Sequence, residues 1–105
     1  MKKCEEAYIY SLENTLKIFG GKWKSIIMWY LHSNGTKRYG EIKKVLPGIT
    51  HKMLSQQLRE LEKDDIVIRK EFPQVPPKVE YSLTKKGSSL IPILLSICEW
   101  GFDNL

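Results

Sequence analysis

The residues with the clearest chemical use follow Thr50, where hydrogen-bond donors share one face of a predicted helix. Three leucines mark the opposite, apolar face, because they are spaced by four and three residues: Leu54, Leu58 and Leu61. The polar face carries no carboxylate before Glu60 and consists of His51, Lys52, Ser55, Gln56 and Arg59. Gln56 suits adenine N6 and N7, and Arg59 suits guanine or a phosphate. These side chains are therefore expected to read base edges in a major groove.

Basic residues gather around the same helix. Residues 36–59 contain six basic residues and one acidic residue, which is as large an excess as the net charge of +5 of the whole chain. A positive charge concentrated in one segment favours a polyanion, with nucleic acid ahead of an anionic membrane. The hydroxyl of Thr50 at the helix N-terminus suits a phosphate. Four more residues are expected at the phosphate backbone, where they add affinity without reading sequence: Lys37, Arg38, Lys43 and Lys44.

Helical periodicity organises the first two thirds of the chain. Apolar residues predict helices over 8–19, 22–32 and 39–46, with a short extended piece over 37–39. Pro47-Gly48 interrupts the third helix, and Thr50 is a favourable N-cap for the helix that runs to about Lys63. Two helices joined by a short glycine-containing turn predict a helix-turn-helix over about 40–63.

After Asp65 the period changes to that of β-strands. Strands are expected over 66–72 and 78–83, and Thr84 is expected to cap a final helix. The connection over 73–77 contains three prolines, which cannot join a strand ladder. We therefore predict a two-stranded hairpin, a wing over about 66–83, with Lys70 and Lys78 reaching an adjacent minor groove or phosphate.

The last predicted helix, over 85–101, is apolar around nearly its whole circumference and must be buried on at least two sides. A subunit interface shared with the helix over 8–19 is the favoured interpretation, and a central core helix is the alternative. Cys98 on this helix is expected to be a small buried hydrophobic residue. The residues expected at the interface between two copies are Leu12, Leu16, Ile91, Leu94, Leu95, Cys98 and Trp100.

The remaining features exclude other classes of protein. A chain of 105 residues fits one domain over 1–105, and its apolar stretches are too short to span a membrane. The N-terminus lacks the apolar segment of a signal peptide, so we expect a cytoplasmic location. Two distant cysteines and two lone histidines make no zinc site, and no phosphate loop or paired nucleophile is present. We expect no enzyme, no metal and no cofactor.

Several segments together resemble the HxlR family of bacterial and archaeal regulators, which are related in fold to MarR-type proteins. The resemblance covers about Tyr10 to Gly101 and is carried by GGKWK at 20–24, KRY at 37–39, LPGIT at 46–50, KMLSQQLRELE at 52–62, PPKVEYSLT at 76–84 and CEWG at 98–101. It implies an α+β, mainly α, winged helix-turn-helix fold with dimerisation helices at both ends of the chain. It also implies a homodimer on palindromic double-stranded DNA and transcriptional control that often responds to reactive small molecules. The alternative is a winged-helix module that binds proteins and no specific DNA.

Two positions depart from the family pattern. Several family members sense oxidants through a Cys-Pro pair ten residues before the Gly-Gly pair, where this chain has Tyr10 and Ser11. Cys4 lies six residues further upstream, so it does not occupy the sensing position. Asp65 stands where the family usually carries glycine after the recognition helix. A left-handed backbone there would cost about 1 kcal/mol with aspartate.

Overall fold

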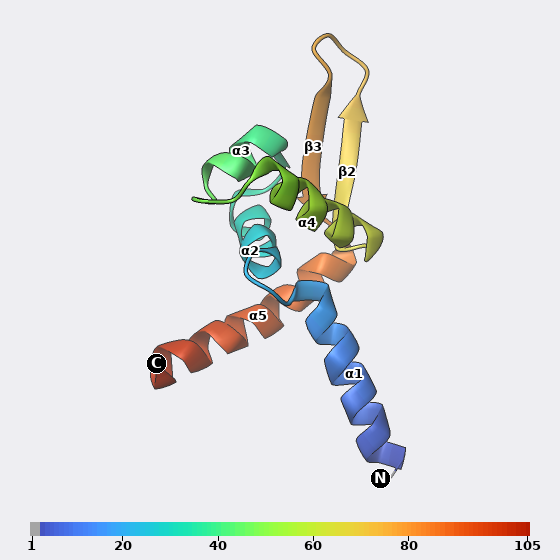
Figure 1. Cartoon of the computed structure of the whole chain (residues 1–105), viewed down its shortest axis with the longest axis vertical. Helices are drawn as coiled ribbons and strands as arrows, with labels where there is room; N and C mark the ends of the chain where they lie inside the picture. Colours follow the sequence, from blue (N-terminus) through green and yellow to red (C-terminus); the bar gives the residue numbers. More distant parts are fainter. Residues whose placement is uncertain (1–2) are drawn as a thin grey trace.

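A computed structural model describes residues 3–105 and shows a central body from which two helical arms diverge and a hairpin protrudes (Figure 1). The arms are α1 and α5, and the hairpin is formed by β2 and β3. In chain order the elements are α1 (Lys3–Phe19), α2 (Lys24–Asn34), β1 (Lys37–Arg38), α3 (Tyr39–Lys44), α4 (His51–Lys63), β2 (Val67–Phe72), β3 (Lys78–Leu83) and α5 (Lys85–Asn104). Every predicted helix and strand is present, and the largest difference in bounds is that α1 begins five residues earlier.

Both predicted threonine caps are confirmed. The Oγ1 atom of Thr50 accepts a hydrogen bond from the backbone N–H of Met53 at 3.1 Å, at the start of α4. The Oγ1 atom of Thr84 accepts one from the backbone N–H of Gly87 at 2.9 Å, at the start of α5. Each cap satisfies a backbone donor that has no partner within its helix.

The end of α4 is closed by Asp65, whose φ of 60° is left-handed. The N–H of Asp65 bonds to the carbonyl of Glu62 at 3.0 Å, and the N–H of Ile66 bonds to the carbonyl of Leu61 at 2.9 Å. This is the hydrogen-bond pattern of a Schellman motif, in which glycine usually takes the left-handed position. Leu61 and Ile66 are both fully buried, so the motif also contributes to the core.

The sheet has three strands where the sequence predicted two. All pairings are antiparallel and the strand order is β1-β3-β2. Lys37 lies opposite Tyr81, and Arg38 lies opposite Glu80. The predicted two-stranded hairpin is confirmed as β2 and β3, and the predicted extended piece over 37–39 contains β1. Its pairing with β3 was not predicted, because a two-residue strand shows no periodicity. The added strand attaches the wing to the segment that begins the helix-turn-helix.

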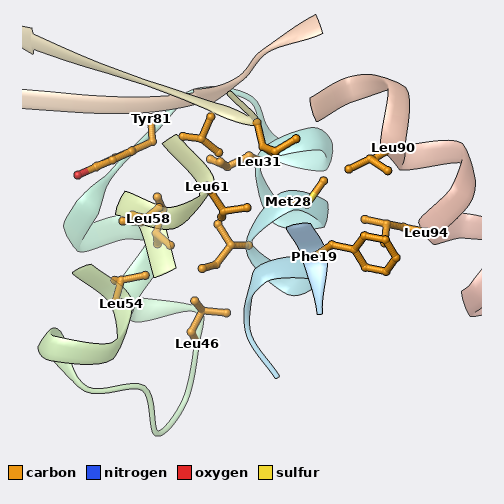
Figure 2. Packing of buried hydrophobic residues seen from close by; sticks show 14 of the residues in the cluster. Phe19, Met28, Leu31, Leu46, Leu54, Leu58, Leu61, Tyr81, Leu90 and Leu94 are labelled. Atoms are coloured by element: carbon orange, nitrogen blue, oxygen red, sulfur yellow. The ribbon is translucent and has the colours of Figure 1, made fainter. Parts of the chain in front are cut away.

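The core lies between α2, α4, α5 and the base of the sheet (Figure 2). As predicted, the three leucines of α4 are buried, and they pack with residues of α2 that include Met28 and Leu31. Ile91 and Leu94 are only 5% and 8% exposed and belong to this same core. Their predicted place between two copies does not agree with this burial, since α5 turns one apolar side toward its own chain.

The two arms leave much apolar surface uncovered. On α1, residues 4–14 are exposed, and on α5 every residue from 95 to 100 is exposed. The radius of gyration is 15.7 Å, whereas a compact domain of this length has about 13 Å. The accessible surface is 7603 Å², compared with about 6,100 Å² for a compact monomer of 12.3 kDa. Despite this apolar surface, no helix among residues 3–105 is long and apolar enough to cross a membrane.

Candidate nucleic-acid interface

The polar face of α4 presents three exposed side chains with free donors. Lys52, Gln56 and Arg59 are exposed on the side opposite the buried leucines. Among residues 3–105, none of these three side chains has a recorded hydrogen-bond or ion-pair partner. Each of these side chains carries N–H donors that can bind acceptors on base edges or phosphates, and the packed helix holds them in place.

Tyr39 of α3 holds the other two predicted reading residues. Its ring stacks on the ring of His51, with centroids 5.8 Å apart and planes 12° apart. Its hydroxyl lies 3.1 Å from Nδ1 of His51, 3.1 Å from the His51 carbonyl oxygen and 3.4 Å from Oγ of half-buried Ser55. The structure therefore leaves only part of the His51 ring free, and Tyr39 fixes how α4 begins.

Thr50 lies at the exposed N-terminus of α4. Its Oγ1 accepts the capping hydrogen bond, so the hydroxyl proton remains able to donate to a phosphate. The first turn of α4 contains no acidic residue. Both the helix dipole and the local charge thus favour an anion at this end.

The basic residues before α4 divide into two pairs. In the first pair, Oε2 of Glu41 lies 3.8 Å from Nζ of Lys37, whereas Oε1 accepts a hydrogen bond from the backbone N–H of Arg38 at 3.0 Å and leaves the exposed guanidinium of Arg38 charged. Lys43 and Lys44, in the last turn of α3, have no carboxylate partner among the described residues. These two lysines keep their full charge for a phosphate backbone.

The two lysines predicted on the wing already contact other side chains of the wing. Lys70 and Lys78 place Nζ 5.0 Å and 4.9 Å from the ring centre of Phe72. Nζ of Lys78 also lies 3.4 Å from Oε2 of Glu80. The net charge that this face of the wing can offer to DNA is therefore small.

Sequence reasoning missed Arg69 and Tyr39. Arg69 lies opposite Tyr81 in the sheet, and a hydrogen bond to that side chain raises the pKa of the guanidinium further above its ordinary value. Nη1 of Arg69 lies 3.6 Å from Oε2 of Glu71. The strand register places exposed Arg69 on the same face as Tyr81. The contact of Tyr39 with α4 spans 12 residues, and no local pattern predicts it.

The predicted interface residues lie at the other end of the molecule. Leu12 and Leu16 on α1, and Leu95 and Trp100 on α5, are between 43% and 62% exposed in this single chain. Cys98 is exposed as well, so its own chain does not provide the burial that the sequence predicts for this residue. It borders an open apolar groove of about 410 Å³ between α2 and α5, with Phe19, Ile26, Trp29 and Ile97 also in its wall.

Known proteins share this sequence and arrangement. The model of the HxlR-like helix-turn-helix family matches residues 18–105. MalR of Fusobacterium mortiferum, which is named for a regulatory role, is 59% identical over 97 residues, covering 92% of each chain. The helix-turn-helix transcriptional regulator YtcD of Bacillus subtilis is 48% identical over 101 residues, which cover 96% of this chain and 79% of YtcD.

Solved structures agree with this similarity. The reduced form of the redox regulator HypR superposes with a TM-score of 0.84 at 51% identity, covering 90% of this chain and 92% of HypR. The crystal structure of YtcD superposes with a TM-score of 0.83 at 50% identity, covering 88% of this chain and 93% of YtcD.

Proposed function

The chain belongs to the HxlR-like helix-turn-helix family of DNA-binding transcriptional regulators, and from that premise we propose that it acts as a homodimer on a palindromic operator. Each copy inserts α4 into a major groove. The observation that carries this proposal is the exposed, acid-free face of Lys52, Gln56 and Arg59 on a helix fixed by its cap and its leucines.

The proposed contacts differ in what they contribute. Gln56 and Arg59 supply base readout, together with Lys52 and the accessible parts of His51 and Ser55. Thr50, Lys43 and Lys44 bind phosphates and supply affinity that depends on salt. Lys37 and Lys78 contribute less, because the carboxylates of Glu41 and Glu80 pair with them. Arg38 and Lys70 keep their positive charge for a phosphate, since Glu41 contacts Arg38 through its backbone N–H and Lys70 lies over the ring of Phe72.

The second copy binds through the exposed sides of α1 and α5. These arms expose Leu12, Leu16, Leu95, Cys98 and Trp100, which form the proposed interface. Ile91 and Leu94 are left out of this interface because they are buried within one chain. Two-fold symmetry then presents the recognition helices to half-sites about 34 Å apart, one helical turn of DNA.

HypR is a redox regulator. We do not assign that role to this chain, because it lacks a cysteine at the position where the family senses oxidants. The position holds Tyr10, which has no thiol and is 71% exposed on α1. This position therefore offers no thiol for an oxidant to modify.

The proposal is tested by selecting an operator from random DNA duplexes and comparing two single variants. Gln56→Ala is expected to weaken binding to the selected operator by about 1–3 kcal/mol while leaving nonspecific binding unchanged. Lys44→Ala is the matched control on the adjacent helix, and it is expected to weaken binding to all sequences and to reduce the salt slope by about one.

If Gln56→Ala leaves the affinity for the operator unchanged while Lys44→Ala lowers it, the α4 assignment is wrong. If the unaltered protein binds all duplexes equally weakly at every salt concentration, the alternative of a protein-interaction module is favoured instead.

A further inference from the structure

Lys24, in the first turn of α2, is a buried cation that joins three helices. It is 8% exposed, and charged residues are almost never buried without a partner. Its Nζ lies 3.3 Å from Oε2 of Glu60 on α4 and donates to the carbonyl oxygen of Lys17 on α1 at 3.4 Å. One ammonium group therefore links the arm, the body and the recognition helix.

The contact with α1 lies at the end of that arm that meets the body. From residue 4 to residue 14 the helix is exposed, whereas Phe19 in its last turn is buried. The carbonyl of Lys17 is in the last turn of α1, where carbonyl groups lack helical partners and a cation is favourable. Lys24 therefore binds α1 where the direction of the whole arm is set.

The contact with α4 holds a carboxylate away from the DNA-reading face. Oε2 of Glu60 also accepts a hydrogen bond from Nε2 of Gln57 at 3.3 Å, so two donors on one side of α4 bind this carboxylate. Glu60 directly follows Arg59, and a released carboxylate next to that guanidinium would compete with a DNA phosphate for it. Lys24 both neutralises Glu60 and ties the second half of α4 to α2.

We propose that Lys24 is a positioning residue that fixes the direction of α1 relative to α4 and thereby sets the spacing of the two recognition helices. This inference depends on the proposed dimer. The 17 residues of α1 make a helix about 25 Å long, so a rotation of about 10° at its base moves its far end by about 4 Å. A shift of this size is more than the rise of one base pair.

The first test measures a distance between α1 and α4, which depends on the angle between the two helices, in the absence of DNA. Spin labels are placed at Ala7→Cys and Lys63→Cys in a Cys4→Ser, Cys98→Ser background, and labelled protein is mixed with excess unlabelled protein so that only distances within one chain are recorded. Lys24→Met, which keeps the apolar stem, is expected to broaden the distance or shift it by about 3 Å. Lys22→Met is the control, because Lys22 is exposed and contacts only the ring of Trp23.

A Lys24→Met distribution that superposes on that of the unaltered protein would overturn the proposal. Glu60→Gln provides a second variant if Lys24→Met fails to fold, since the Glu60 side chain is 42% exposed. This variant removes the charge that holds Lys24 to α4, and it is expected to broaden the same distance. An unchanged distance in Glu60→Gln would also count against the proposal.

The second test measures the preference for half-site spacing. The unaltered protein and Lys22→Met are expected to lose about tenfold in affinity when two base pairs are inserted between the half-sites, and Lys24→Met about threefold or less. Equal losses for all three proteins would show that Lys24 only adds stability. If the unaltered protein has no spacing preference, the dimeric function fails, while the spin-label distances still decide the role of Lys24.

Discussion

At the scale of single residues, the base-reading surface is narrower than the sequence suggests. Periodicity correctly placed five donors on the polar face of α4, but Tyr39 stacks on His51 and its hydroxyl lies near Oγ of Ser55. No pattern in the chain indicated that Lys24 is buried, because its partners Lys17 and Glu60 come from two other helices. Patterns along the chain predict which face a residue occupies, whereas its partners across the fold depend on packing.

Asp65 provides a test of stability at this scale. Its left-handed φ of 60° is strained for aspartate, and its side chain is exposed with no recorded partner among the described residues. Asp65→Gly is expected to raise the free energy of unfolding by about 1 kcal/mol, because glycine adopts this conformation without strain. Urea denaturation measures the change, and unchanged or lower stability would contradict the strain at Asp65.

At the scale of elements, the helices and the wing were predictable because their apolar residues repeat at 3.6 or two positions. The extended piece that became β1 was predicted, but its place in the sheet was not, because β1 has only two residues and is defined by its pairing with β3. The start of α1 was also missed, since its first residues are mostly polar and carry no apolar stripe. For α5, apolar residues on all sides could not indicate which side faces its own chain.

Gly87 shows how closely α5 packs against the turn after α4. A Cβ atom added to Gly87 would collide with the backbone carbonyl oxygen of Ile66, which also accepts a hydrogen bond from the N–H of Thr84 at 3.0 Å. Because neither backbone can easily move, Gly87→Ala is expected to lower the free energy of unfolding by about 1–3 kcal/mol.

Gly40→Ala is the control for this prediction, because an added Cβ meets nothing within 4 Å there. It is expected to be neutral or to stabilise α3 by up to about 1 kcal/mol. Thermal unfolding of both variants provides the measurement. Equal effects would mean that the close approach at Gly87 does not constrain α5.

At the scale of the whole molecule, the single chain is incomplete as a compact unit. Its arms diverge from the body, and their apolar side chains include Trp100, which is 62% exposed. Large aromatic residues at the centre of an interface often supply much of its binding energy. This exposed surface supports the dimer that we propose.

Trp100→Glu tests the dimer directly. Since the indole is mostly exposed within one chain, the variant is expected to keep its fold but weaken dimerisation by about 2 kcal/mol or more. Val75→Glu is the control, because Val75 is 100% exposed in the connection between β2 and β3. The tip of this hairpin points away from both arms in Figure 1. Analytical ultracentrifugation measures both, and a monomeric mass for the unaltered protein at micromolar concentration would contradict the dimer.

Because α1 is exposed in the single chain, its helical structure is expected to depend on the protein concentration. Helices shorter than about 12–15 residues are only marginally stable alone in water, and residues 4–14 of α1 are exposed in the single chain. If a second copy covers this segment, its helical structure and the association of the subunits form one coupled equilibrium. Diluting the protein would then unwind α1 as the subunits separate, and the regulator would lose its arm and its partner together.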